Sequence, residues 1–269
     1  MTTDHAPAAL ITGASSGIGR SYAEQLALRG YAPVLVARRA DRLAELAEAI
    51  HRDTGLEATV LAADLAEEGG LARVEQAVLG HDSLAVVVNA AGLGALGPLT
   101  RVEPADLNRL VAVNVLALTR LSRAALLAFG ERGSGTLINI SSIGAFHAPP
   151  DGSAYGASKA YDLHFSRALQ RDVEGSGIRV QVVLPGPVRT EFFEASGMDD
   201  SVFPQESFVE ADAFVRAALT GLDLGELVCI PTLPDTAAWE DSAARQQRLR
   251  DAAGLRGVIA ERYHRPADG

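Results

Sequence analysis

The chain has 269 residues, a length that fits one large α/β domain or two small ones. Its hydrophobic share of 48% is enough for a sizeable core, and its 22% of charged residues is close to the usual value. The net charge of −10 and the scattered arginines argue against a nucleic-acid partner, which would require a basic face.

Short apolar runs alternate with longer amphipathic segments. We predict strands at Ala8–Thr12, Pro33–Ala37, Ala58–Ala62, Leu84–Val88, Thr136–Ile140, Ile178–Leu184 and Glu226–Ile230. Apolar residues at helical spacing predict helices at Ile18–Arg29, Ala40–Arg52, Glu67–Leu79, Pro104–Phe129 and Ser153–Glu174. Continuous apolar strands are typical of a sheet covered on both faces. The expected fold class is therefore α/β, a Rossmann-like, doubly wound parallel sheet of about seven strands flanked by helices.

No linker divides the chain, so we expect one domain over residues 1–269, with a lid near 191–210 and a helical tail near 235–264. The N-terminus has no basic segment followed by an apolar one, and no segment approaches the roughly 18 apolar residues of a membrane span. A cytoplasmic protein without a membrane partner is the expectation. The single cysteine, Cys229, lies in an apolar run, which favours a buried side chain over a nucleophile.

A glycine-rich turn follows the first predicted strand and opens the first helix. Such a turn lets a pyrophosphate approach the backbone N–H groups of a helix N-terminus. The candidate binding residues are Gly13, Ser15, Ser16, Gly17, Ile18 and Gly19. No Lys-Ser/Thr pair follows the last glycine, so the turn is not a P-loop. The spacing Thr-Gly-x-x-x-Gly-x-Gly resembles the classical short-chain dehydrogenase/reductase (SDR) family.

The end of the second strand indicates which nicotinamide cofactor binds. An NAD site places an acidic residue about 20 positions after the glycines, where it holds the ribose 2′-hydroxyl. Ala37 stands there instead, followed by Arg38 and Arg39. A guanidinium group suits a 2′-phosphate, so we expect NADP(H), with Arg38 on the phosphate and Arg39 stacking on or flanking the adenine. An exposed residue at the helix start is the alternative for Arg39.

Further segments carry the resemblance along the chain. The family resemblance implies that Asp64, followed by Leu65, contacts the adenine; a helix N-cap is a second role open to Asp64. The stretch Asn89-Ala90-Ala91-Gly92 resembles the family's N-A-G motif. There Asn89 is expected to brace the central strands, while Ala90 and Gly92 let the cofactor lie close.

The segment after the sixth strand resembles the family's P-G-x-V-x-T motif. It contains Pro185, Gly186, Val188 and Thr190. The resemblance implies that the Val188 backbone and the Thr190 hydroxyl bind the nicotinamide carboxamide.

The expected catalytic set lies on the fifth strand and the helix after it. Tyr155 and Lys159 are four residues apart and share one helix face. A neighbouring ammonium favours tyrosinate and so lowers the tyrosine pKa. Ser142 precedes Tyr155 by thirteen residues, the spacing typical of the family, with Ser141 as its competitor. The resemblance implies that Tyr155 is the acid/base, Ser142 polarises the carbonyl, Lys159 also holds the nicotinamide ribose, and Asn114 holds a water of the proton relay.

The function implied is an NADP(H)-dependent oxidoreductase that transfers hydride between NADPH and a ketone or aldehyde, or the reverse. A non-catalytic NADP-binding regulator and an epimerase or dehydratase on the same fold are the alternatives. We expect an apolar small-molecule substrate, because the segment 191–208 is rich in large apolar residues: Phe192, Phe193, Met198, Phe203 and Phe208. The alternative for some of these side chains is that they merely anchor the loop and do not contact the substrate. His147 is expected at the surface rather than on the substrate.

No His, Cys or carboxylate cluster has metal spacing, so no metal is expected. A homodimer through the two long helices is expected. A tetramer is possible but in doubt, because residues 227–234 depart from the family's C-terminal pattern.

Overall fold

The computed structural model of the chain describes residues 6–147, 150–254, 257–260 and 263. The chain divides into two compact units, Met1–Thr232 and Leu233–Gly269. The second unit contains helix α9 (Ala237–Gly254), which has no buried residue. The expected single domain therefore ends at Thr232, because α9 contributes no side chain to a core. Parts of the expected N-terminus and tail, and residues 148–149, lie outside the described residues.

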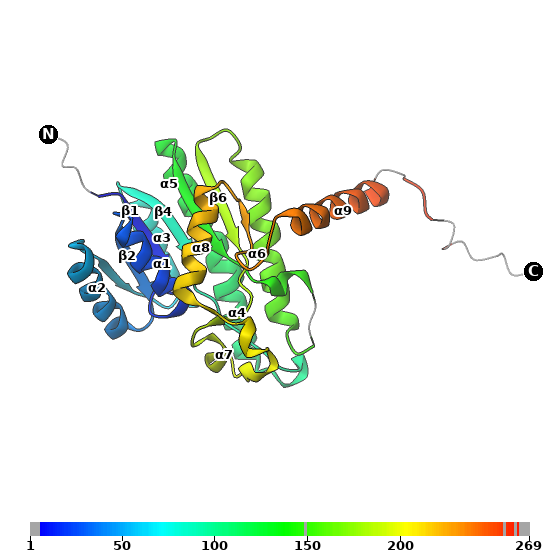
Figure 1. Cartoon of the computed structure of the whole chain (residues 1–269), viewed down its shortest axis with the longest axis horizontal. Helices are drawn as coiled ribbons and strands as arrows, with labels where there is room; N and C mark the ends of the chain where they lie inside the picture. The colour runs from blue at the N-terminus through cyan, green and yellow to red at the C-terminus, as the bar shows by residue number, and fades with distance from the viewer. Residues whose placement is uncertain (1–5, 148–149, 255–256, 261–262, 264–269) are drawn as a thin grey trace, which may run out of the picture. The chain divides into compact units, whose positions relative to one another are not determined.

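Seven parallel strands form the central sheet in the order β3-β2-β1-β4-β5-β6-β9 (Figure 1). Their bounds are β1 (Ala8–Thr12), β2 (Ala32–Ala37), β3 (Thr59–Ala62), β4 (Leu84–Asn89), β5 (Gly135–Ile140), β6 (Ile178–Val183) and β9 (Val228–Cys229). The strand order changes direction between β1 and β4, and in such sheets ligands bind at the carboxyl ends of the strands near this point. The predicted doubly wound sheet is confirmed.

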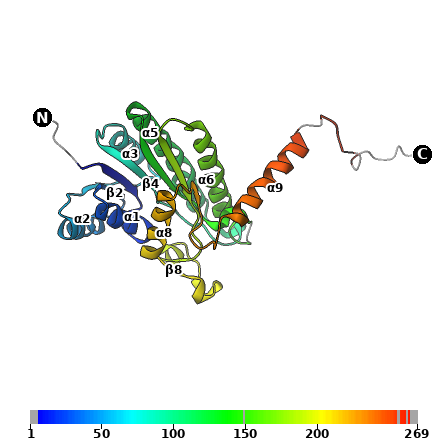
Figure 2. The same cartoon turned by 45° about the horizontal axis from the view of Figure 1, so that its top comes forward.

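Helices cover both faces of this sheet. Figure 2 shows α3 (Glu68–Leu79), α5 (Leu118–Arg132) and α6 (Ser153–Asp172) on one side and α1 (Gly17–Leu28), α2 (Ala40–Thr54) and α8 (Ala211–Asp223) on the other. Side chains of β1 alternate between the two cores: Ala9 and Ile11 enter one, Ala8 and Leu10 the other. Because both faces are buried, the central strands are apolar at nearly every position.

The long helix before β5 has three parts. It comprises α4 (Pro104–Val111), a π-helical segment, η2 (Ala112–Ala117), and α5. The sequence predicts one helix at this place, without the π-helical segment. Such segments are rare and are frequent at functional sites. This one contains Asn114, whose side chain is buried.

The same stretch is apolar enough to resemble a membrane span. By length and composition alone, Pro104–Arg132 could cross a membrane, with a mean hydropathy of 1.6 in its most apolar window. The expectation that no segment approaches this limit is therefore wrong. Half of that window is buried in the fold. Leu121, Ala125 and Phe129 lie in the core against the sheet, which explains the hydropathy of this helix.

The expected lid has a defined base. The short strands β7 (Val188–Arg189) and β8 (Val209–Glu210) pair with each other and so bring its two ends together. Between them lie α7 (Phe192–Ala195) and two turns of 3-10 helix, η4 (Asp200–Val202) and η5 (Gln205–Ser207). Two further 3-10 turns are η1 (Leu99–Arg101) and η3 (Ile143–Phe146). The lid is thus a closed loop on a two-stranded base.

Candidate active site

A cleft of about 760 Å³ lies at the carboxyl ends of the strands. It is lined by the β1–α1 turn, by the ends of β2 to β6, by α6 and by the lid. The predicted site residues line this cleft, apart from Asn89 and Asn114, which are buried. The fold therefore brings together segments that lie more than 150 residues apart in the sequence.

The β1–α1 turn has the geometry of an anion site. Gly17 has a φ of +53°, and a Cβ there would lie 2.8 Å from Thr190 Cγ2. Only glycine fits such a position without strain. Ser16 is the N-cap of α1, but its side chain makes no capping hydrogen bond. An anion in the cleft can therefore take the place of a capping group at this helix N-terminus.

The two arginines after β2 lie in different surroundings. Arg39 donates hydrogen bonds to Ser15 Oγ at 3.0 Å and Ser16 Oγ at 2.9 Å, and forms an ion pair with Glu191 at 2.8 Å. Arg42 binds the same carboxylate. Arg38 is exposed, and its charge acts on Asp64. Arg39, which the sequence analysis puts beside the adenine, thus lies on the serines of the glycine-rich turn.

Asp64 forms a corner at the end of β3. Its carboxylate accepts a hydrogen bond from the Ala66 N–H at 2.9 Å and forms an ion pair with Arg109 at 2.8 Å. Burial raises the pKa of Asp64, but these two partners outweigh burial and the pKa lies below its usual range. The N-cap of α3 is Glu67, so the N-cap role expected for Asp64 is wrong. The sequence did not predict the role of Arg109, since nothing in the sequence distinguishes a single arginine of an amphipathic helix that binds a distant carboxylate from one that faces solvent.

Asn89 braces the centre of the sheet. It lies opposite Asn139 in the β4–β5 register, and its amide donates to Asn139 Oδ1 at 2.9 Å and Ser122 Oγ at 3.2 Å. Thr12 ties β1 to the following loop, because its hydroxyl accepts hydrogen bonds from the Ala90 and Ala91 N–H groups at 3.1 Å. The backbone around the cleft is thereby fixed from behind.

Ser142 and Tyr155 meet inside the cleft. The Ser142 hydroxyl is hydrogen-bonded to Tyr155 and also accepts the Gly144 N–H at 3.0 Å. Ser141, its competitor in the sequence, instead donates to the backbone carbonyl of Lys159 at 2.9 Å. The register of β5 therefore gives Ser142, not Ser141, to the tyrosine.

The charge state of Tyr155 differs from the sequence expectation. Burial raises its pKa to about 12, although the hydrogen bond with Ser142 lowers it. The Lys159 amine lies 5.9 Å from the tyrosine ring centre and donates to the Ile140 carbonyl at 2.7 Å. Burial lowers the pKa of Lys159. The lowered tyrosine pKa expected from Lys159 is thus absent here, because burial of the phenol dominates.

Lys159 is also the only lysine in the sequence, against 23 arginines among the 24 basic residues. An arginine stays protonated in essentially any protein environment, whereas the pKa of a lysine shifts readily when it is buried. Lys159 is therefore the one Lys or Arg side chain in the sequence whose charge burial can readily change.

Asn114 holds the loop above Lys159. Its side chain accepts the Leu93 N–H at 2.8 Å and donates to the Leu93 carbonyl at 2.9 Å and to Ser158 Oγ at 3.0 Å. A Cβ at Gly92 would lie 3.7 Å from the Lys159 amine and 3.8 Å from Asn114 Oδ1. The Lys159 amine and Asn114 Oδ1 therefore both lie next to Gly92, and the water relay stays a prediction.

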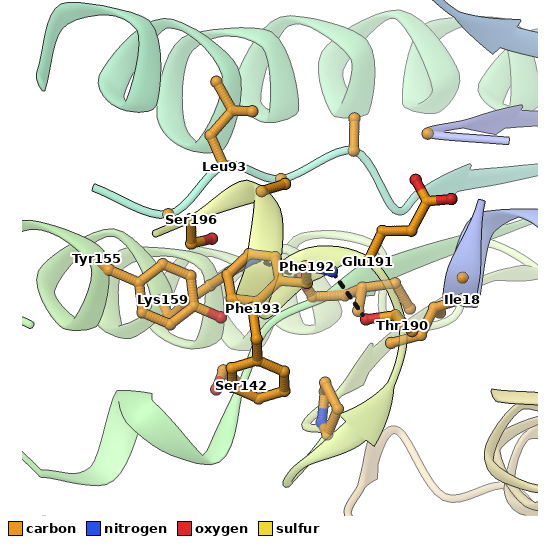
Figure 3. Close-up of a pocket in the computed structure, with 18 of the residues that line it drawn as sticks. Ile18, Leu93, Ser142, Tyr155, Lys159, Thr190, Glu191, Phe192, Phe193 and Ser196 are labelled. Carbon is orange, nitrogen blue, oxygen red and sulfur yellow. Dashed lines mark hydrogen bonds between the residues drawn. The ribbon is translucent and has the colours of Figure 1, made fainter. Parts of the chain in front are cut away.

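The lid aromatics form one connected set that reaches Tyr155, because Phe192 packs against Phe193 with ring centres 5.8 Å apart. Phe192 lies beside the phenol of Tyr155, with ring centres 5.4 Å apart (Figure 3). Phe193, Phe203 and Phe208 form a cluster with ring centres 5.5 to 6.2 Å apart. Phe192 therefore borders the reacting groups, whereas Phe208 belongs to the cluster that holds the lid. His147 is exposed at the edge of the cleft.

This arrangement can transfer a proton to an oxygen atom. A phenol that retains its proton at neutral pH stands beside a serine hydroxyl, and an amine lies behind both in a cleft with an apolar lid. These groups can place a donor and a hydrogen-bond partner on the same substrate oxygen, which is the requirement for general acid/base catalysis.

Comparison with known proteins agrees with this geometry. Residues 7–200 match the family described as short chain dehydrogenase. A short-chain dehydrogenase from Sphingobium yanoikuyae, solved in complex with NADPH, is 38% identical; the match covers 96% of this chain and 100% of that chain, with a TM-score of 0.91. A bulky-bulky ketone specific alcohol dehydrogenase from Comamonas testosteroni is 36% identical, with 96% and 99% covered and a TM-score of 0.87. A very-long-chain 3-oxoacyl-CoA reductase from Anas platyrhynchos is 31% identical over 83% of this chain and 72% of its own length.

Proposed function

The chain belongs to the short-chain dehydrogenase family, and we propose that it reduces bulky, largely apolar ketones with NADPH. It is an NADP(H)-dependent oxidoreductase that interconverts carbonyl and alcohol groups on a small molecule. The observation that carries the substrate proposal is the position of Phe192, which puts an apolar lid directly against Tyr155. The similarity to a bulky-bulky ketone specific enzyme supports the same class of substrate.

The residues of the cleft fit NADP(H). Ser15, Ser16 and Arg39 surround an uncapped helix N-terminus, and Ala37 places no acidic side chain at the end of β2. Glu191, which pairs with Arg39, is the carboxylate that a 2′-phosphate would displace. Arg39 is the residue we assign to this phosphate. Lys159, on the far side of the cleft, would hold the nicotinamide ribose. When bound, the nicotinamide supplies or accepts the hydride.

The chain's own residues handle the proton. In reduction, Tyr155 donates its phenolic proton to the carbonyl oxygen as that oxygen gains charge. The Ser142 oxygen accepts the Gly144 N–H, and the Ser142 hydroxyl is hydrogen-bonded to Tyr155, so its O–H lies where it can hold the same oxygen. In the oxidation of an alcohol, the deprotonated Tyr155 removes the hydroxyl proton. Lys159 and Asn114 stand behind the phenol, on the proposed path by which the proton is replaced.

The two reaction directions should respond differently to pH. With a tyrosine pKa of about 12, the proton donor is present throughout the neutral range, whereas the fraction of base rises about tenfold per pH unit below the pKa. We therefore expect kcat/KM for alcohol oxidation to rise steadily from pH 7 to 9 and kcat/KM for ketone reduction to stay flat. Profiles measured in both directions check this, and an oxidation rate that is independent of pH would contradict it.

The substrate proposal is tested with ketones of increasing bulk, from acetone through acetophenone to benzophenone, each assayed with NADPH. We expect the highest kcat/KM for the bulkiest compounds. Phe192→Ala should lower this preference roughly tenfold, since loss of apolar contact in a pocket is worth about 1–3 kcal/mol.

Phe208→Ala is the matched control, because Phe208 belongs to the aromatic cluster and does not line the cleft. It should leave the ranking of the ketones unchanged. If both substitutions lowered the preference for bulky ketones equally, the preference would depend on the folding of the whole lid and not on contact between Phe192 and the substrate. If no ketone on the panel is turned over, the substrate proposal is wrong.

The proposal also includes a homodimer through the long helices and a cytoplasmic location. Exposed apolar side chains on these helices support the first, with Leu116, Leu127 and Tyr161 exposed to 47%, 46% and 37%. The single cysteine is compatible with the second, because a reducing compartment places no demand for disulfides.

A further inference from the structure

Asp162 is a buried carboxylate that the reaction scheme above does not use. It lies three residues after Lys159 on α6 and is 0% exposed. Its Oδ2 atom lies 3.9 Å from the Lys159 amine and has no hydrogen-bond donor among the described residues. Aspartates are almost never fully buried without a partner. The Lys159 ammonium is the group that meets this need.

The geometry at the amine leaves room for a ligand. A lysine ammonium has three N–H donors. One reaches the Ile140 carbonyl at 2.7 Å, and Asp162 faces the amine from its own helix. Lys159 and its neighbour Gly92 both line the cleft. The amine is thus held from behind and open in front.

Asp162 is itself held by the centre of the sheet. Its Oδ1 atom accepts a hydrogen bond from Ser166 at 3.3 Å, and Ser166 accepts one from Asn139 at 2.9 Å. Asn139 in turn accepts one from Asn89 at 2.9 Å. This chain of side chains links the carboxylate to β4 and β5, whereas the Lys159 amine is held by its own hydrogen bond to the Ile140 carbonyl.

Among the residues that the structure describes, the other groups around this pair supply no second counter-charge. Tyr155 is the titratable neighbour on α6, and the negative charge of Asp162 raises its pKa. On α4 and β6, Arg109 pairs with Asp64, and Arg179 bonds to Thr136. The polar side chains that η2, β4, β5, α5 and the residue after β5 place here are uncharged: Asn114, Asn89, Asn139, Ser122 and Ser141.

We propose that Asp162 is a positioning residue: the buried counter-ion that keeps Lys159 protonated and holds its ammonium group at the edge of the cleft. A charge of opposite sign within about 4–6 Å favours the charged form of a group by one to three pKa units. Burial alone would favour the neutral amine, and the carboxylate opposes this. The proposal rests on the proposed function for its effect on turnover, but not for the charge of Lys159.

The charge can be measured directly because the chain has one lysine. Protein labelled with ¹³C,¹⁵N-lysine gives one side-chain signal, which is followed against pH without cofactor or substrate. In Asp162→Asn the pKa of Lys159 should fall by one unit or more, because the charged amine loses its partner. Ser166→Ala is the matched control. It breaks the same hydrogen-bond chain but keeps the carboxylate, so the lysine pKa should stay close to that of the parent protein.

An unchanged lysine pKa in Asp162→Asn would overturn the proposal, as would an equal fall in Ser166→Ala. The parent protein gives a second readout that needs no variant. Burial raises the pKa of Asp162 to about 6, so the lysine signal should show an inflection near that pH. A lysine signal without this inflection would contradict the proposal even if Asp162→Asn failed to fold.

Kinetics extend the test to the reaction. In Asp162→Asn, kcat/KM for ketone reduction should begin to fall at a pH at least one unit lower on the alkaline side, because the lysine loses its proton earlier. If kcat/KM of Asp162→Asn fell at the same alkaline pH as in the parent protein, a role of Asp162 in turnover would be contradicted. If the parent protein reduces no ketone, the proposed function fails, while the lysine titration still decides the role of Asp162.

Discussion

Tyr155→Phe should lower kcat/KM for ketone reduction by roughly 10²- to 10⁴-fold, the range that a positioned acid/base contributes. The substitution removes the hydroxyl but keeps the ring that lies against Phe192, so the shape of the cleft is preserved. Ser142 remains and can still hold the carbonyl oxygen, but it has no comparable proton to give. Steady-state rates with NADPH and the best ketone of the panel measure the effect.

Tyr161→Phe provides the control on the same helix. Tyr161 is exposed and hydrogen-bonded to Thr119, away from the cleft. We expect parent activity from it, and unchanged NADPH binding by both variants. A loss of less than tenfold in Tyr155→Phe would mean that another group, or water, supplies the proton.

The fold was largely predictable because its signal is local. Each central strand is buried on both faces, so its sequence is a continuous apolar run bounded by turns, and the strand bounds agree closely with those observed for β1 and β4. Helix α8 was missed, although Phe214, Val215, Ala218 and Leu219 have helical spacing. It directly follows the lid, which is also rich in apolar residues, so the start of a separate helix is hard to recognise in the sequence.

The reacting groups were predictable for a related reason. Ser142, Tyr155 and Lys159 lie at the end of a strand and on the helix after it, so short-range spacing places them together. Asp162 and Glu191 were not predictable. A carboxylate on a helix or in a loop normally faces solvent. Whether it is buried beside an amine, or paired with Arg39 from another βα unit, depends on tertiary packing that periodicity does not report.

The assignment of the two arginines leads to the second large effect. Arg39→Ala should raise KM for NADPH roughly 10- to 100-fold, since a hydrogen bond to a charged group is worth about 1.5–3 kcal/mol. NADH has no 2′-phosphate, so its KM should change little and the preference for NADPH should narrow. Initial rates at saturating ketone, with each cofactor varied, measure both constants.

Three further variants separate the possible roles of Arg39. Arg42→Ala removes the second partner of Glu191 without touching the serines of the turn, so it should leave the cofactor preference intact. Glu191→Gln frees Arg39 from a competing carboxylate and should lower KM for NADPH. Arg38→Ala tests the assignment made from the sequence. If Arg38→Ala abolishes the preference for NADPH over NADH, while Arg39→Ala weakens the binding of both cofactors equally, then Arg38 binds the phosphate. Arg39 would in that case connect the lid to the glycine-rich turn.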